Sequence, residues 1–406
     1  MRKILLGTTG VVGAALLTMG AAQAQTAPTV RIGGYFDFSV GFINDDSDTN
    51  MITQSVSGSR SDLQQYDFRS DAEIVINVAG KAANGMSYGA TIELQVDNVG
   101  VGGPGTAVDT DEMWAFVSSP TLGTLQFGDQ DSAANQMQVR APFLATNSAS
   151  GRWTDFVQHQ GSARYMVTSI NDGGDRTKII YLSPQFFGFD FGFSFAPNGG
   201  EGERERTGLG VGTDGNITTS LPFFQRSAAT TQNEFTAALR YRGSFGNIGV
   251  AAGFAMTTSE VEKTRAPGSQ DPNAYTVGLS VSGFGLTVGG EYMWGSFAPG
   301  SGGTGVIANG RDNSTSWAIG ATYTMGAFAF GAYYGSAESD TSAPGRGDRD
   351  HSVFGIGAEY TIAPGLVGFA NYTMVSNSNL EGTTGAVTAG RSRDVDAFIL
   401  GVNLAF

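Results

Sequence analysis

The chain has 406 residues and a formal net charge of −14 at pH 7, with 60 glycines and no cysteine. The lack of cysteine excludes a disulfide scaffold and a thiolate metal site, and the acidic balance argues against nucleic-acid binding. Charged residues make up only 15% of the chain, well below the roughly 25% of soluble globular domains.

Residues 1–24 have the pattern of a cleaved export signal. Arg2 and Lys3 form a short positive region, an apolar stretch follows, and Ala22 and Ala24 place small residues before a cleavage point after Ala24. We therefore expect a mature chain of residues 25–406, forming one domain. Loss of two bases and no acid would change the net charge from −14 to −16. The alternative is a weak amphipathic anchor at the N-terminus.

Large apolar residues alternate with small or polar residues from residue 30 to the end of the chain. In the first segment Val30 and Ile32 share one face and Asp37 lies on the other. In the last segment the face opposite Phe398 is small or polar except for Ile399. This period of two is typical of strands with one apolar and one polar face. About sixteen segments show it: 30–42, 65–80, 86–97, 111–120, 122–130, 177–184, 187–197, 233–242, 245–257, 273–282, 284–295, 314–323, 327–336, 351–361, 366–375 and 395–406.

The connections between these segments alternate between long polar links and tight turns that contain Gly, Pro or Asn. Long loops on one side and short turns on the other are typical of a bacterial transmembrane barrel. The polar faces carry Arg, Asp and Glu, which would be prohibitive to bury unpaired in a secreted β-sandwich or adhesin but can line water in a wide barrel. Aromatic residues such as Trp114, Tyr275 and Trp294 stand toward the ends of the apolar faces, as interfacial girdles require.

The sequence therefore predicts an all-β fold, a transmembrane antiparallel β-barrel of about 16 strands. Its short turns would be periplasmic and its long loops external. Backbone groups at an open sheet edge would be unsatisfied in lipid, so we expect the first and last strands to pair and close the barrel.

Four stretches, in this order and spacing, resemble the Gram-negative general diffusion porins, the trimeric sixteen-stranded group of proteobacteria. They are "VRIGGYFDFSVGF" at 30–42, "GTLQFGDQDS" at 123–132, "IIYLSPQFFGFDFGFSFA" at 179–196 and "GVNLAF" at 401–406. The resemblance implies a homotrimer in the outer membrane of a Gram-negative bacterium, in contact with its lipid and lipopolysaccharide. It also implies that the terminal Phe406 is part of the signal read by the barrel-assembly machinery.

The longest connection, residues 131–176, corresponds to the third loop of these porins, which folds into the barrel and narrows the pore. A structureless loop of this length usually has a function; the alternative is an external loop with solvated charges. Here it holds four Asp and four Arg, and Asp129 stands where family members often have a base, so the pattern of an acidic loop facing a basic wall is not evident. Candidate constriction residues are Asp131, Arg140, Arg152, Asp155 and Arg164 in the loop, and Asp67, Arg69, Glu73, Glu93 and Arg240 on the strands.

These features predict an outer-membrane pore for passive diffusion of ions and small hydrophilic solutes, with mild cation selectivity from the acidic charge. The alternatives are a solute-specific channel, a barrel enzyme, or a surface anchor or adhesin. We expect no cofactor and no catalysis, because neither His159 nor His351 lies in a nucleophile or metal motif, although a triad can be assembled from distant residues.

An acidic tract near the end of the first segment is a candidate divalent-cation site. Asp45, Asp46 and Asp48 could supply its oxygen ligands, but the full spacing of a calcium loop is missing. A solvated external loop is the simpler interpretation.

Overall fold

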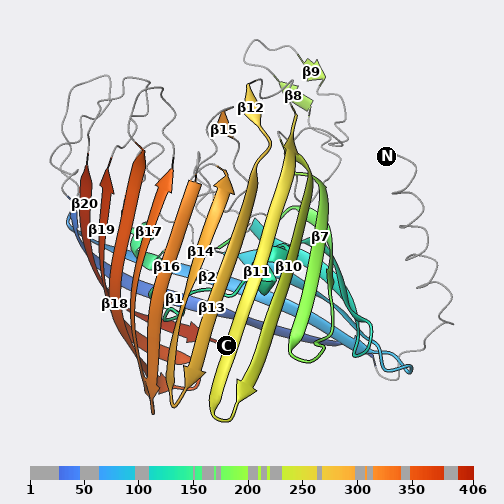
Figure 1. Cartoon of the computed structure of the whole chain (residues 1–406), viewed down its shortest axis with the longest axis horizontal. Coiled ribbons are helices and arrows are strands. Elements are labelled where there is room, and N and C mark those ends of the chain that lie inside the picture. The colour runs from blue at the N-terminus through green and yellow to red at the C-terminus, as the bar shows by residue number, and fades with distance from the viewer. Residues whose placement is uncertain are drawn as a thin grey trace.

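The computed structural model describes residues 27–45, 64–96, 109–149, 151–157, 169–170, 175–199, 209–211, 217–219, 231–262, 268–297, 307–308, 314–339, 348–378 and 392–406. Within these residues sixteen antiparallel strands close into one barrel (Figure 1). No helix in this part of the chain is long and apolar enough to cross a membrane. The barrel strands are β1 (Thr29–Asp45), β2 (Tyr66–Lys81), β3 (Ser87–Gln95), β4 (Asp109–Ser119), β5 (Gly123–Asp129), β6 (Thr177–Leu182), β7 (Phe189–Asn198), β10 (Thr231–Phe245), β11 (Ile248–Val261), β13 (Asn273–Gly283), β14 (Leu286–Ser296), β16 (Ser314–Met325), β17 (Phe328–Ser339), β18 (Arg349–Ala363), β19 (Leu366–Ser378) and β20 (Arg393–Ala405).

The predicted segments coincide with these strands to within a few residues, which confirms the predicted fold. Two small sheets were not predicted. One pairs β8 (Leu209–Val211) with β9 (Ile217–Thr219), and the other pairs β12 (Ser269–Gln270) with β15 (Ile307–Ala308). Both lie beyond the upper ends of the barrel strands in Figure 1. Strands of two or three residues are too short to show a period of two.

The first and last strands meet, as predicted. β1 pairs with both β2 and β20, and the register places Phe42 opposite Phe398 and Tyr35 opposite Ala405. At the lower end of this seam the backbone N–H groups of Gly34 and Phe406 donate to each other's carbonyl oxygens, each at 3.1 Å. The chain thus ends within the closing ladder, and no sheet edge remains in the barrel.

Each barrel strand has one outward apolar face and one inward face that is polar or small. In β7, Phe191 and Phe193 are exposed on the outside while Asp190 and Ser194 are buried on the inside. Outward aromatic residues cluster at both rims: Tyr275 stacks on Trp294 near the upper ends of their strands, with ring centroids 5.7 Å apart, and other aromatic pairs lie near the lower turns. These are the two interfacial girdles expected of a membrane barrel.

Trp114 does not belong to the outer girdle, contrary to the sequence prediction. It lies opposite Thr91 in the ladder, and the Thr91 hydroxyl is buried on the inner face, where it donates to the side-chain oxygen of Asn77. Residues opposite each other in a ladder point to the same side of the sheet. The cause is a β-bulge between Ile92 and Leu94, which shifts the alternation of β4 by one residue.

A buried ion pair joins β1 to β20 near the upper end of the seam. Arg393 donates to both carboxylate oxygens of Asp45, with its Nε 3.1 and 3.2 Å from them and its Nη2 2.5 Å from Oδ2. Both side chains are almost fully buried. Asp45 is therefore held inside the barrel wall. Asp46 and Asp48 lie outside the described residues, so the candidate cation site stays a prediction.

We expect Arg393→Met or Asp45→Asn to lower the free energy of unfolding by about 3–5 kcal/mol, because either change leaves one charge buried without its partner. The double variant Asp45→Leu/Arg393→Met should recover most of the loss. Urea unfolding in detergent, followed by the electrophoretic shift between folded and unfolded barrel, measures this. Asp394→Asn, an exposed position on the same strand, is the control. Single variants as stable as the control would contradict the prediction.

Candidate functional site

The third long connection enters the barrel directly after β5. Its first turn is the short helix α2 (Ala133–Met137), which begins when the Ser132 hydroxyl accepts from the Asn135 backbone at 3.3 Å. The backbone N–H groups of Ala133 and Ala134 donate to wall hydroxyls on β7 and β10, each at 3.3 Å. Wall side chains thus satisfy the free donors at the start of this helix.

The chain then crosses the inside of the barrel toward β1. The backbone N–H and hydroxyl of Thr146 both donate to Glu359 of β18, at 2.9 and 2.8 Å. The Asn371 amide of β19 donates to the Thr146 carbonyl at 2.7 Å, and the Tyr333 hydroxyl of β17 donates to the Ser148 carbonyl at 2.8 Å. Hydrogen bonds to several strands fix the path of the backbone along the inner wall.

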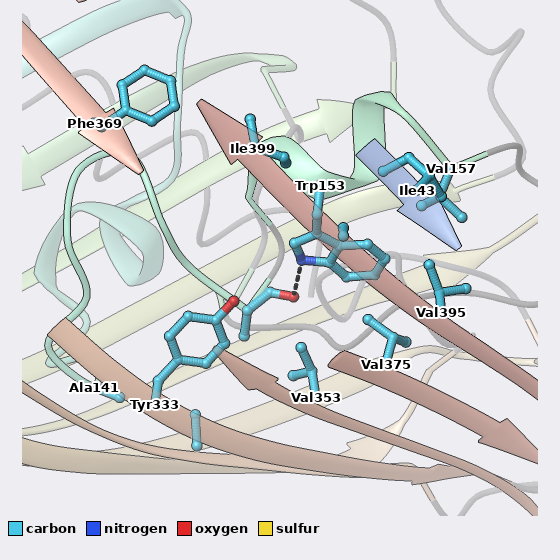
Figure 2. Close-up of a cluster of buried hydrophobic side chains, with 13 residues drawn as sticks. Ile43, Ala141, Trp153, Val157, Tyr333, Val353, Phe369, Val375, Val395 and Ile399 are labelled. Carbon is cyan, nitrogen blue, oxygen red and sulfur yellow. Dashed lines mark hydrogen bonds between the residues drawn. The ribbon is translucent and has the colours of Figure 1, made fainter. Parts of the chain in front are cut away.

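An apolar cluster holds the far end of the crossing. Trp153, in the 3-10 turn η1 (Arg152–Asp155), is 1% exposed and donates its indole N–H to the Ala149 carbonyl at 3.2 Å. Figure 2 shows its ring among Ile43, Val395 and Ile399 of the first and last strands. Ile399, the apolar exception on the inner face of the last segment, is thus explained by the aromatic ring that covers it.

These contacts confirm the prediction that the third loop folds into the barrel. We call residues 131–149 and 151–157 the inner segment. The return part of the loop is described only at Ser169–Ile170 and from Asp175. Ile170 is fully buried, and its backbone N–H donates to the Gln138 side-chain oxygen at 2.8 Å, so the two halves of the loop touch.

Six carboxylates gather where the loop leaves β5 and returns to β6. Each of two trios has carboxylate oxygens within 4.8 Å of one another. We call this set the acidic cluster: Glu73, Glu93 and Asp111 in one trio, and Glu112, Asp131 and Asp175 in the other. Oxygens this close could also hold a hard cation such as Ca²⁺. Nearby bases lie on β6 and just before it: Lys178 donates to the Gln130 carbonyl, and Arg176 is 2.7 Å from Glu234.

The bulge between Ile92 and Leu94 creates part of the acidic cluster. Ile92 lies opposite Met113 and Leu94 opposite Thr110, so Asp111 and Glu112 both stand across from Glu93. An unbroken ladder would have sent one of these two acids to the lipid face. Sequence reasoning found Glu73, Glu93 and Asp131 but did not select Asp111 and Glu112, because no residue in the sequence signals the bulge.

A second charged group lies at the far end of the inner segment. Arg69 of β2 holds Asp155 at 2.5 Å and Asp71 at 3.4 Å. Arg152 forms an ion pair with buried Asp37 of β1, and its guanidinium lies 5.1 Å from the centroid of the Phe369 ring. A recess of about 450 Å³ opens beside these groups. The loop end is thus held by charge as well as by the Trp153 cluster.

Burial raises the pKa of Asp155 from 3.8 to about 6; Arg69 opposes this shift, and Asp71 adds to it. The Asp155 side chain is about one quarter exposed, so its proton can exchange with water in the lumen. Its charge therefore changes near pH 6.

The remaining predicted residues are spread over the lumen. Arg140 is exposed on the inner segment, with its Nη2 2.5 Å from the Asn135 side-chain oxygen. Arg240 of β10 holds Asp190 at 2.7 Å, lower in the barrel. Asp67 is exposed at the upper end of β2, and Arg164 lies outside the described residues.

His351 is the described histidine, and it is buried on β18. Its Nδ1 lies 2.5 Å from the Asn377 side-chain oxygen. This contact does not resemble a nucleophile–base pair. His159 lies outside the described residues.

A closed sixteen-stranded membrane barrel with a charged loop folded inside defines a pore of the bacterial outer membrane. Residues 10–380 match the family model described as Gram-negative porin. The chain belongs to this family. No curated protein matches the chain by sequence.

Solved porin structures share the fold at low identity. An anion-selective porin from Comamonas acidovorans superposes with a TM-score of 0.56 at 14% identity, covering 94% of this chain and 100% of that chain. OmpT, an outer membrane protein of Vibrio cholerae, gives 0.55 at 13%, covering 95% and 100%. A mutant of the Rh. blastica porin gives 0.51 at 15%, covering 93% and 100%.

We expect the ion selectivity to change with pH through Asp155. Below pH 6 the carboxyl is neutral, so the lumen loses one negative charge and the ratio of cation to anion permeability falls. Asp155→Asn mimics the neutral form, so the reversal potentials of variant and wild type should differ most at pH 7 and above and converge near pH 5. Bilayer recordings from pH 8 to pH 4 under a fixed potassium chloride gradient measure this, with Asp394→Asn as the control. A difference that stays constant over this range would contradict the prediction.

Proposed function

We propose that this porin allows passive diffusion of ions and small hydrophilic solutes and prefers cations mildly. The observation that carries the proposal is the acidic cluster, which lies on the inner face of β2–β4 and at the two roots of the third loop, after β5 and before β6. Flow through such a pore needs no conformational cycle. Its size limit is set by the narrowest part of the lumen and its charge preference by the groups that line it.

The density of carboxylates in the acidic cluster supports cation preference. Six of them lie together there, whereas Arg69, Arg152 and Arg240 are spread over the lumen and each lies beside a carboxylate of the wall or loop. A unit charge about 8 Å from a passing ion in water contributes about 0.5 kcal/mol, or about a twofold change in local ion concentration. Groups on the lining matter more than the net charge of the whole chain, because salt screens distant charges within about 8 Å.

Arg140 is the base that the inner segment exposes to the lumen. The arrangement places acids on the wall and at the roots of the loop, and a base on its middle. This differs from the arrangement of acidic loop and basic wall implied by the resemblance, which is kept only where Arg69 of the wall holds Asp155 of the loop. A field between these groups would orient dipolar solutes as they pass.

At pH 9 we expect Glu93→Gln/Glu112→Gln to lower the ratio of potassium to chloride permeability by about fourfold, since each ionised carboxylate removed contributes about twofold. The reversal potential in a planar bilayer under a potassium chloride gradient measures this. Asp394→Asn removes one negative charge from an exposed position on β20 and should leave the ratio unchanged. A wild-type pore that prefers anions, or a double variant that matches the control, would contradict the proposal.

We also propose that the protein assembles as a homotrimer. One matching structure of OmpT from Vibrio cholerae is described as a trimer form, and the outward face of the barrel offers a large apolar surface. Outer-membrane lipid and lipopolysaccharide would contact the rest of this face. The barrel-assembly machinery would read Phe406, whose side chain is largely exposed at the end of the closing seam.

For a trimer we expect each insertion into the bilayer to add three equal units of conductance, because three pores insert together. These units should then close one after another. Chemical cross-linking in mild detergent, followed by mass measurement of the heated and unheated protein, provides a second test. Insertion in single steps together with a monomeric mass would contradict the trimer and leave the pore proposal untouched.

A further inference from the structure

Six glycines on six consecutive strands form a groove along the inner wall. In the ladder they form three directly opposed pairs: one between β11 and β13, one between β14 and β16, and one between β17 and β18. We call this set the glycine groove: Gly253 with Gly278, Gly289 with Gly320, and Gly331 with Gly357. Each of these glycines stands next to an exposed outward residue in its strand, so all six positions point inward.

One residue of the inner segment lies over each glycine pair. Val139 covers the first pair: a Cβ at Gly278 would overlap its carbonyl oxygen, and a Cβ at Gly253 would stand 2.9 Å from its side chain. Pro142 covers the second pair, where a Cβ at Gly320 would overlap its carbonyl oxygen. The backbone of the inner segment therefore lies directly on the backbone of the sheet.

Leu144 covers the third pair with its side chain. A Cβ at Gly331 would stand 2.6 Å from the Leu144 Cγ, and one at Gly357 would stand 3.1 Å from a Leu144 methyl. Separations under about 3 Å force one group to move, because packed interiors have no slack of that size. A larger residue in the groove would push the inner segment toward the pore axis.

Polar side chains beside the glycine groove hold the segment in place. Glu291, which lies opposite Gly278, accepts from the Gln138 amide at 2.7 Å and from the Ala141 backbone. Pro142 has no N–H and needs no acceptor on the bare wall. Val139 and Ala141 face the wall and are buried, so Arg140, which stands between them in the sequence, faces the lumen.

We propose that the glycine groove sets the aperture of the pore. Its glycines are positioning residues: they let the inner segment lie flat on the wall and so fix both the width left open and the place of Arg140. This inference rests on the proposed passive pore and adds to it the residues that determine its size limit and part of its selectivity.

The test is the single-channel conductance of glycine-to-alanine variants. A Cβ stands about 1.5 Å from the backbone, so Gly278→Ala and Gly320→Ala, whose Cβ atoms meet loop backbone, should lower conductance about 1.5-fold or more. Both should also shift the reversal potential, because Arg140 moves with the segment. Gly253→Ala, whose Cβ meets a side chain, should have a smaller effect. Gly368→Ala is the control, because its Cβ has no neighbour closer than 3.4 Å.

A paired variant keeps the test decisive if the first two fail to fold. Gly331→Ala should lower conductance, and Leu144→Ala in the same chain should restore it, because it removes the side chain that the new methyl group displaces. Folded Gly278→Ala and Gly320→Ala pores that conduct like Gly368→Ala, or a Gly331→Ala effect that Leu144→Ala leaves unchanged, would overturn the inference. A wild-type barrel without conductance would instead overturn the proposed pore.

Discussion

Backbone hydrogen bonding in a hydrocarbon environment governs this fold. Lipid offers no partner to an N–H or C=O group, so every strand must pair on both sides and the sheet must close. Here the closing contact is made by β1 and β20, which join residues from opposite ends of the chain. The alternation of apolar and polar residues follows from the same constraint, because closure gives each strand one face toward lipid and one toward the lumen.

The lumen is partly filled by the protein itself. The inner segment forms a second layer that packs an apolar cluster around Trp153 at one end and lies on bare backbone over six strands in its middle. Large residues on the inner wall are tolerated where this segment covers them, as at Ile399. Small residues are required where its backbone touches the sheet, as at Gly278 and Gly320. The inner wall thus carries a pattern complementary to one particular path of the loop.

Charge is organised by the same two layers. At the far end of the inner segment, Arg69 and Arg152 tie the loop to acids of β1, β2 and the loop itself. At the roots of the third loop the acidic cluster brings together groups of one sign, because a bulge turns two consecutive acids of β4 toward one acid of β3. Ion pairs thus position the far end of the loop, and the acidic cluster lies at its roots.

The sequence predicts the number and limits of the strands, the closure of the barrel and the two faces of the sheet. It does so because apolar and polar residues alternate in every strand, so the position of a residue in this alternation indicates the face on which it lies. Glu73, Glu93 and Asp131 could be assigned to the lumen on the same basis. The inward turn of Asp111 and Glu112 could not, since a bulge changes the parity of a strand without a local signature. The glycine groove was equally hidden, although every one of its glycines is visible in the sequence. Its meaning depends on which loop residue crosses each strand. That path is set by contacts between segments far apart in the sequence, such as Thr146 with Asn371, which are 225 residues apart.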